Sequence, residues 1–152
     1  MTQPALIEKI CKTVPLTDQR QHDTPADKIL YKGGEPRKMD SHYRSAIGQL
    51  NYLTGSTRPE IMMTTHQCAR FSTDLRLSHE QAVKWVVHCL KRMDTQGIIM
   101  RLDKDPGLEC HVDADFAGGW SKQYTDDAST CYSRTGYIIW YAGCPLIWAS
   151  RM

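Results

Sequence analysis

Two aspartates, Asp113 and Asp115, are the residues of this chain best suited to metal chemistry. They lie two positions apart in Leu108–Asp115, where apolar and polar side chains alternate. Alternate residues of a β-strand face the same side of a sheet, so both carboxylates share one face, opposite to Val112 and Ala114. Mg²⁺ prefers oxygen ligands of this kind. The pattern therefore predicts a weak Mg²⁺ site, although acidic pairs at strand ends are more often solvated rims.

A thiol or zinc site is disfavoured by the spacing of the cysteines and histidines. No C-x-x-C pair is present, and the cysteine–histidine neighbours do not form the two short paired motifs of a zinc site. The N-terminus also lacks the charged and apolar blocks of a signal peptide. We therefore expect an intracellular protein with reduced thiols. The cysteines are Cys11, Cys68, Cys89, Cys110, Cys131 and Cys144.

A second candidate site is basic. Residues 1–102 contain 15 Lys and Arg against 10 Asp and Glu, while residues 103–152 contain 4 against 7, so the two parts carry +5 and −3. A basic helical part can contact the phosphates of an RNA:DNA hybrid or another nucleic acid, with strong salt dependence and little sequence preference. Asp74, Glu80 and Asp94 dilute this patch. The candidate binding residues are Arg70, Arg76, Lys84, Lys91 and Arg92.

The elements that position these residues follow from hydrophobic periodicity. Apolar residues recur at three- and four-residue steps from Tyr43 to Leu53, which predicts an amphipathic helix ending at Gly55. Thr57, with Pro59 and Glu60 after it, has the composition of a helix N-terminus, and this second helix is expected to reach about Ser72. The same signature at Ser78 predicts a third helix, with Val83, Val86, Leu90 and Met93 on its apolar side.

Beyond Gly97 the periodicity changes to two, which predicts strands. Candidate strands are Ile98–Leu102, Leu108–Asp115, Arg134–Tyr141 and Cys144–Ser150, with a turn at Asp105–Gly107. Before the helices, residues 1–40 contain a short apolar helix and then a polar, proline-rich stretch that we expect to be extended and to bury little surface. The predicted fold class is α+β, with a small three-helix segment followed by antiparallel strands.

Several segments resemble the Pol polyprotein of copia-type retrotransposons, in the region that joins reverse transcriptase to ribonuclease H. The helical part matches the family's YRS-x-(I/V)-G-x-L-x-YL and TRP(D/E)I signatures, and the strand part matches V-D-A-D and the motifs after it. The matching segments, in chain order, are Tyr43–Leu53, Ser56–Ile61, His66–Ser72, Val112–Gly118, Ser133–Tyr137, Tyr141–Pro145 and Ile147–Ser150.

The resemblance implies three parts: a palm-end remnant and extended linker over 1–40, a helical thumb- or connection-like segment over 41–96, and a truncated ribonuclease H-like domain over 97–152 with the first three strands of that fold. It also implies that Asp113 is the first catalytic, metal-binding carboxylate of ribonuclease H, with Asp115 the next contributor. The family's other carboxylates follow the strand that ends here near Ser150. We therefore expect an incomplete metal set.

Three functions follow from this reading. The leading hypothesis is a Pol fragment without catalysis of its own. The alternatives are a non-specific module for RNA:DNA hybrids and a ribonuclease H whose site another chain completes. We expect the remaining parts of a Pol polyprotein as partners. We also expect self-association, because three strands alone leave an unpaired edge and an apolar patch around Trp140, Ile147 and Trp148. The 152 residues contain no apolar run long enough for a membrane span.

Overall fold

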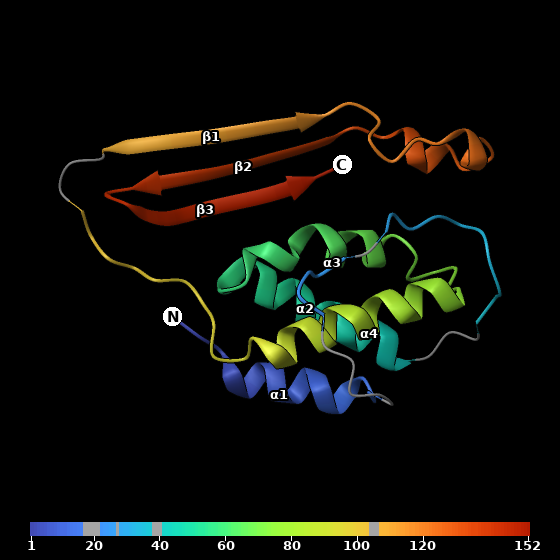
Figure 1. The fold of residues 1–152 in the computed structure, drawn as a ribbon, viewed down its shortest axis with the longest axis horizontal. Coiled ribbons are helices and arrows are strands. Elements are labelled where there is room, and N and C mark those ends of the chain that lie inside the picture. Colours follow the sequence, from blue (N-terminus) through green and yellow to red (C-terminus); the bar gives the residue numbers. More distant parts are fainter. Residues whose placement is uncertain (17–21, 27, 38–40, 104–106) are drawn as a thin grey trace. The chain divides into compact units, whose positions relative to one another are not determined.

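The computed structural model describes residues 1–16, 22–26, 28–37, 41–103 and 107–152. They form two compact units, Thr2–Gly97 and Ile98–Met152, the latter together with Met1. The described part of the first unit contains four α-helices, and that of the second contains three β-strands (Figure 1). The predicted α+β class, with helices before antiparallel strands, is confirmed. No helix in the described ranges has the length and hydropathy needed to cross a lipid bilayer.

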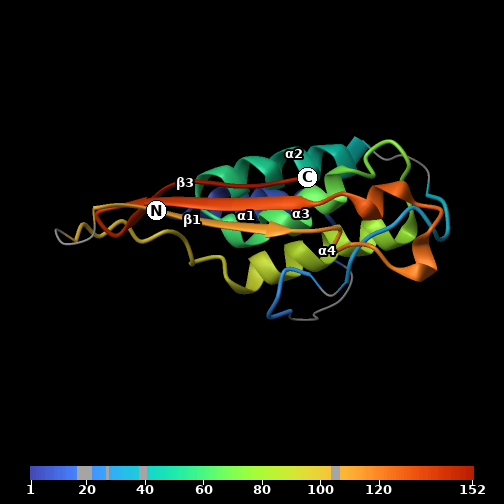
Figure 2. The ribbon, with the colours of Figure 1, turned by 90° about the horizontal axis from the view of Figure 1, so that it is seen from above.

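The helical unit is a bundle of helices (Figure 1 and Figure 2). Buried apolar side chains from these helices form one core. Its helices are α1 (Pro4–Thr13), α2 (Ser41–Ser56), α3 (Met62–Ala69) and α4 (Leu77–Arg92), with a short 3₁₀ turn η1 (Pro59–Ile61) before α3. The apolar stripe predicted for the first helix of the signature is buried on α2 at Tyr43, Ala46, Ile47, Leu50 and Leu53. The stripe on α4 is buried at Val83, Val86 and Leu90.

The N-terminal segment differs from the expectation that it buries little surface. Its short apolar stretch is helical, as expected, but α1 packs Ile7 and Ile10 into the same core. The polar stretch also contributes, because Leu30 is buried and the Trp85 indole N–H donates to the Thr24 carbonyl at 2.7 Å. Apolar side chains spaced far apart along a polar segment give no periodic signal, so this burial depends on tertiary contacts.

The predicted helix ends are wrong in detail. Gly55 lies inside α2 rather than at its end, and the left-handed cap expected there is absent, because Gly34 and Gly143 are the described glycines with positive φ. Thr57 does not cap the next helix; Arg58 precedes η1, and its side chain makes no capping bond. The helix that follows ends at Ala69 rather than near Ser72. Local composition located these boundaries to within a few residues, but tertiary contacts set the caps.

The strand unit is a three-stranded antiparallel sheet in the order β1-β2-β3, with β1 (Leu108–Asp115), β2 (Arg134–Tyr141) and β3 (Cys144–Arg151) (Figure 1). A tight turn at Ala142 and Gly143, both with positive φ, joins β2 to β3, and a bulge interrupts their pairing between Ile139 and Trp140. These three strands were predicted.

The predicted strand over Ile98–Leu102 is wrong, because these residues have no ladder partner and form no strand. A single backbone bond, from the Asp103 N–H to the Ala142 carbonyl, connects the end of this stretch to the hairpin turn. An apolar run without a neighbouring strand cannot satisfy its backbone groups as a sheet does. The predicted turn at Asp105–Gly107 includes residues 105 and 106, which lie outside the described residues.

The start of α4 depends on a buried histidine rather than on Ser78. The side chain of His79 is fully buried and stacks on Phe71, with 3.9 Å between ring centroids. Its Nδ1 accepts the Arg76 backbone N–H at 3.1 Å, while Nε2 lies 2.8 Å from the Tyr31 carbonyl. A neutral imidazole with its proton on Nε2 satisfies both contacts, and protonation of Nδ1 would break the first. Burial accordingly lowers the pKa of His79.

The C-terminus of α4 depends on the buried Arg58. Its guanidinium, 1% exposed, donates from Nη1 to the Met93 carbonyl at 2.8 Å and pairs through Nε with Glu60. Arg58 is therefore a second donor to the Met93 carbonyl, which also accepts the Gln96 N–H at 3.1 Å, and it joins the end of α4 to the turn before α3. The R-P-E part of the helical signature thus has a structural role in this unit.

We predict that the stability of the helical unit falls below about pH 6.5 through His79. Its pKa is lowered on folding, so its contribution is complete above the pKa of the unfolded chain and is lost as the pH decreases toward the folded value. The loss is at most about 1.4 kcal/mol per pH unit. Urea unfolding followed by circular dichroism between pH 7.5 and pH 5 measures it. His79→Gln keeps an acceptor for the Arg76 N–H without titrating, so a variant with the same pH dependence as the wild type would contradict the prediction.

We also predict that Arg58→Ala lowers the free energy of unfolding by roughly 2 to 4 kcal/mol, because it removes the bond to Met93 and leaves a cavity. Arg44→Ala is the matched control: Arg44 is an exposed arginine that also donates to one carbonyl, that of Ser72, at 3.3 Å. Its loss is expected to cost under about 1 kcal/mol. Equal effects of the two substitutions in urea unfolding would show that Arg58 is not an anchor.

Candidate functional site

The register of β1 against β2 determines which side chains surround the two aspartates. Residues directly opposite each other in an antiparallel pair lie on the same face. Asp113 is opposite Gly136, and Asp115 is opposite Arg134. We call the β1 residues on this side the acidic face, and all of them are exposed, as is the rest of β1. The acidic face consists of Glu109, His111, Asp113 and Asp115.

There is open space beside Asp113 on β2, because its directly opposite residue, Gly136, has no side chain. A Cβ at position 136 would meet the Ala149 carbonyl oxygen at 3.8 Å, an ordinary contact, so the fold itself does not demand glycine there. Gly136 therefore leaves room beside the Asp113 carboxylate for an ion or a phosphate. This feature was not singled out from the sequence; the strand register identifies it.

Asp115 has different surroundings, at the turn that ends β1. Its carboxylate lies over Gly118, where a Cβ would come within 2.2 Å of Oδ1. In the same turn Ala117 has a φ of 51°, its N–H donates to the Ser133 hydroxyl at 3.3 Å, and Phe116 is 94% exposed. Residues two apart on a strand are separated by about 7 Å along the chain. Asp115 would therefore have to turn away from Gly118 to share an ion with Asp113.

The described residues gather no group of three or more His, Cys, Asp or Glu side chains that could hold a metal ion. Asp127, in the loop between β1 and β2, is buried and accepts the Ser129 backbone N–H at 3.1 Å, so it caps the short 3₁₀ turn Ala128–Cys131. On the acidic face, the His111 imidazole lies 3.5 Å from the Glu109 carboxylate. The arrangement thus offers Asp113 and Asp115 as oxygen ligands, and an ion there would need further ligands.

The predicted basic residues are distributed along and beside α4, and several have partners within the chain. Arg76 pairs with Asp74 at 2.9 Å, Lys84 pairs with Glu80 at 2.7 Å, and Arg92 pairs with Asp23. Arg70 donates to the Gln67 side chain at 2.8 Å and lies 5.2 Å from the centre of the Phe71 ring. Lys91 is exposed in the last turn of α4. These ion pairs reduce the positive charge that the sequence alone suggests.

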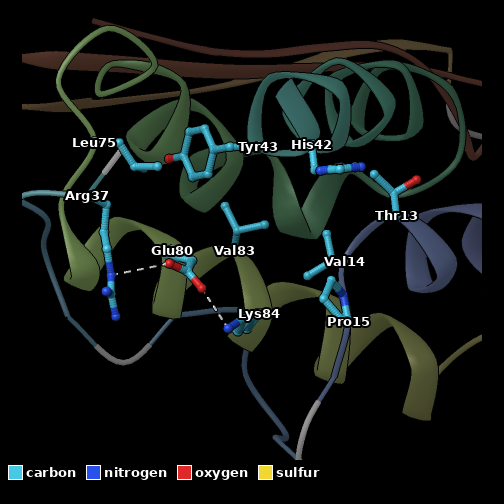
Figure 3. A pocket seen from close by; sticks show the side chains of 10 residues that line it. All are labelled: Thr13, Val14, Pro15, Arg37, His42, Tyr43, Leu75, Glu80, Val83 and Lys84. Atoms are coloured by element: carbon cyan, nitrogen blue, oxygen red, sulfur yellow. Dashed lines mark hydrogen bonds and ion pairs between the residues drawn. The ribbon is translucent and has the colours of Figure 1, made fainter. Parts of the chain in front are cut away.

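A pocket of about 210 Å³ lies in the helical unit beside Lys84 (Figure 3). Val14, Tyr43, Leu75 and Val83 supply apolar walls. The Glu80 carboxylate contacts cations through both oxygens, Oε1 to Lys84 and Oε2 to Arg37 at 3.6 Å. Both oxygens of the Glu80 carboxylate thus face cations of this chain, and a metal ion would have to displace them.

Sequence comparison identifies relatives of this chain. It is 28% identical over 127 residues to the retrovirus-related Pol polyprotein from transposon RE1 of Arabidopsis thaliana, which covers 84% of the chain. It is 33% identical over 110 residues, 72% of the chain, to the corresponding polyprotein from transposon TNT 1-94 of Nicotiana tabacum. The chain is related to retrotransposon Pol polyproteins. The resemblance predicted from the motifs is therefore confirmed.

The relatives differ greatly in length. The chain spans 8% of each of these two Pol polyproteins. It is also 29% identical over 109 residues to a protein named secreted RxLR effector protein 161 from Plasmopara viticola, a match that covers 72% of this chain and 71% of the effector. Neither a protein-family model nor a solved structure matches the chain.

Proposed function

We propose that this chain corresponds to the part of a retrotransposon Pol polyprotein where the reverse transcriptase connection passes into ribonuclease H, and that it does not cleave nucleic acid by itself. The observation that carries the proposal is the position of Asp113: on β1, exposed, directly opposite Gly136 and preceded by the helical unit that contains the Pol-like signature. In this proposal β1 to β3 are the first strands of a ribonuclease H-like domain.

The proposed lack of independent catalysis rests on the chemistry of two-metal hydrolysis. That reaction needs several carboxylates to hold two ions about 4 Å apart, one ion activating water and the other stabilising the leaving oxygen. The acidic face supplies Asp113 and, after a rotation of its side chain, Asp115. Mg²⁺ held by one or two carboxylates usually depends on substrate phosphates for its remaining ligands. Asp113 would therefore bind Mg²⁺ weakly unless other polypeptide contributes.

The match to the effector supports the idea that such a segment can function outside a whole Pol polyprotein. The matched region covers 71% of the effector, so it makes up most of that shorter protein. An intracellular location remains part of the proposal for this chain. It is supported by its six cysteines, which are all free thiols.

A test of the proposal is hydrolysis of an RNA:DNA hybrid by the purified chain with Mg²⁺ or Mn²⁺. We expect no cleavage above the background of a chain carrying Asp113→Asn. We also expect Mn²⁺ binding, followed by electron paramagnetic resonance, to be in the millimolar range or weaker, and to be weakened further by Asp113→Asn. Glu109→Gln is the matched control, because it removes an exposed carboxylate from the same face but not from the proposed site.

Cleavage that disappears in Asp113→Asn would overturn the proposed inactivity and favour the alternative of a complete nuclease. If the chain instead cleaves only after addition of the Pol segment that follows it in a full-length relative, the alternative of a site completed by another chain is favoured. Equal Mn²⁺ binding by the wild type and Asp113→Asn would contradict the assignment of Asp113.

A second proposed function is non-specific binding of an RNA:DNA hybrid by α4. The favouring observation is that Lys84 and Lys91 lie two helical turns apart, on one side of α4 and about 10 Å apart along its axis, so that both can face the same nucleic-acid backbone. The ion pair of Lys84 with Glu80 competes with such contacts.

We predict weak hybrid binding that is lost as salt increases from about 50 to 200 mM. Glu80→Gln frees Lys84 and should strengthen binding, whereas Lys84→Gln combined with Lys91→Gln should weaken it. Lys12→Gln is the control, because Lys12 is an exposed lysine on α1 paired with Glu8 in the same i,i+4 geometry. Fluorescence anisotropy over a salt series measures these effects. Binding independent of salt, or equally sensitive to all three lysines, would exclude an α4 surface.

A further inference from the structure

Residues 22–26, which form neither helix nor strand, contact an aromatic side chain of α4. The His22 imidazole stacks on the Trp85 indole, with 3.4 Å between ring centroids and 12° between ring planes. The indole N–H donates to the Thr24 carbonyl at 2.7 Å. Trp85 is half-buried. We call residues 22–26 the covering segment, because they occupy both the ring face and the polar edge of this tryptophan.

The covering segment also places a negative charge on α4. The Asp23 carboxylate pairs with the Arg92 guanidinium, and both side chains are exposed. An exposed ion pair of this kind contributes little to stability, because water screens it. The His22 ring also meets the ring of the partly covered His88 edge-on, with 5.7 Å between centroids. A flat ring and an anion from adjacent residues of one segment thus lie on the same helix.

The two contacted side chains belong to one side of α4. Trp85 and Arg92 are seven residues apart, which is two helical turns, or about 10 Å along the helix axis. Lys84 and Lys91 each precede one of them by one residue, so they form the neighbouring row, about 100° around the axis. This surface, which we call the aromatic–basic surface, therefore combines one indole ring with three cations.

The two groups that the covering segment presents indicate which ligand would fit. Trp85 accepts a flat ring, and Arg92 accepts an anion. An unpaired nucleotide carries both groups, because its base is a planar ring and its phosphate is an anion. Proteins that bind single strands combine aromatic side chains, on which bases stack, with cations that follow the phosphates. Arginine is well suited to phosphate because its planar guanidinium donates two parallel hydrogen bonds.

An unpaired strand fits the aromatic–basic surface better than a duplex does. In an RNA:DNA hybrid each base is stacked between its neighbours, so the Trp85 ring cannot reach a base face, and the cations alone can contact the phosphates. An unpaired strand can use the ring as well as the cations. Two rows of cations two turns apart also favour a polyanion over a peptide, which has no regular series of negative charges.

We propose that the aromatic–basic surface of α4 binds an unpaired strand of nucleic acid, and that residues 22–26 compete with this strand for the surface. His22 holds the place of a base, and Asp23 holds the place of a phosphate. The inference rests on the proposed binding of nucleic acid by α4. Because the covering segment belongs to the same chain, its effective concentration at the surface is high, and it weakens binding without any further partner.

The first experiment measures binding to a labelled single-stranded DNA of about 12 nucleotides and to an RNA:DNA hybrid of the same length, by fluorescence anisotropy. His22→Ala uncovers the ring and should strengthen binding of the single strand roughly twofold to tenfold, with little change for the hybrid. Asp23→Asn releases Arg92 and should strengthen binding of both, by up to about fivefold. Glu109→Gln is the matched control, because it removes one exposed carboxylate from the strand unit and should change neither.

The second experiment tests the surface itself in the His22→Ala background. A base stacked on Trp85 should quench tryptophan fluorescence, and Trp85→Leu should abolish this quenching while it keeps an apolar side chain at the same position. Arg92→Gln, at an exposed position, should weaken binding of both nucleic acids without affecting the fold. Quenching that persists in Trp85→Leu would come from another tryptophan and would overturn the proposal.

The two nucleic acids separate this inference from the function on which it rests. If His22→Ala leaves binding of the single strand unchanged, the covering segment does not compete and the inference is wrong. Salt-dependent binding of the hybrid through Lys84 and Lys91 would then still support the second proposed function. If neither nucleic acid binds to the wild type or to His22→Ala, both are rejected.

Discussion

The register between β1 and β2 is the constraint on which the candidate site depends. It is held at both ends. At one end the Ala117 N–H donates to the Ser133 hydroxyl, and at the other the Ala142 N–H donates to the Gly107 carbonyl at 3.1 Å. A slip by one residue would move every β1 side chain to the opposite face. The position of Asp113 opposite Gly136, and that of Asp115 opposite Arg134, both follow from this one alignment.

The helical unit is stabilised differently. Its apolar core holds the helices together, and buried polar side chains then hydrogen-bond one element to another. Tyr43 donates its hydroxyl to the Cys68 carbonyl at 2.8 Å, and burial raises the pKa of that hydroxyl, so it remains a donor at neutral pH. Arg58 and His79 act in the same way at the two ends of α4. Tyr43 and Arg58 both belong to the motifs that carry the resemblance to Pol polyproteins. Within the helical unit, the hydrogen bonds of Tyr43 and Arg58 to backbone carbonyls give both residues a structural role that involves no ligand.

The sequence predicted those features that depend on neighbours along the chain. Periodicity located the buried stripes of α2 and α4, and alternation located β1, β2 and β3 together with the shared face of Asp113 and Asp115. Features that need a distant partner were missed. The cap of α4 involves Tyr31, and the partner of Arg92 is Asp23, so neither contact has a local signal. Ile98–Leu102 shows the converse error, because β-like composition does not form a strand without a neighbour to pair with.

The acidic face depends on the same alignment. An ion at Asp113 would bind side-chain oxygens that stand out from the plane of the sheet. Gly136, directly opposite on β2, adds no side chain beside this carboxylate, and Asp113 itself is exposed. The alignment of two strands thus leaves the Asp113 carboxylate accessible to a cation, whereas Asp115, whose carboxylate lies over Gly118, must rotate before it can contribute.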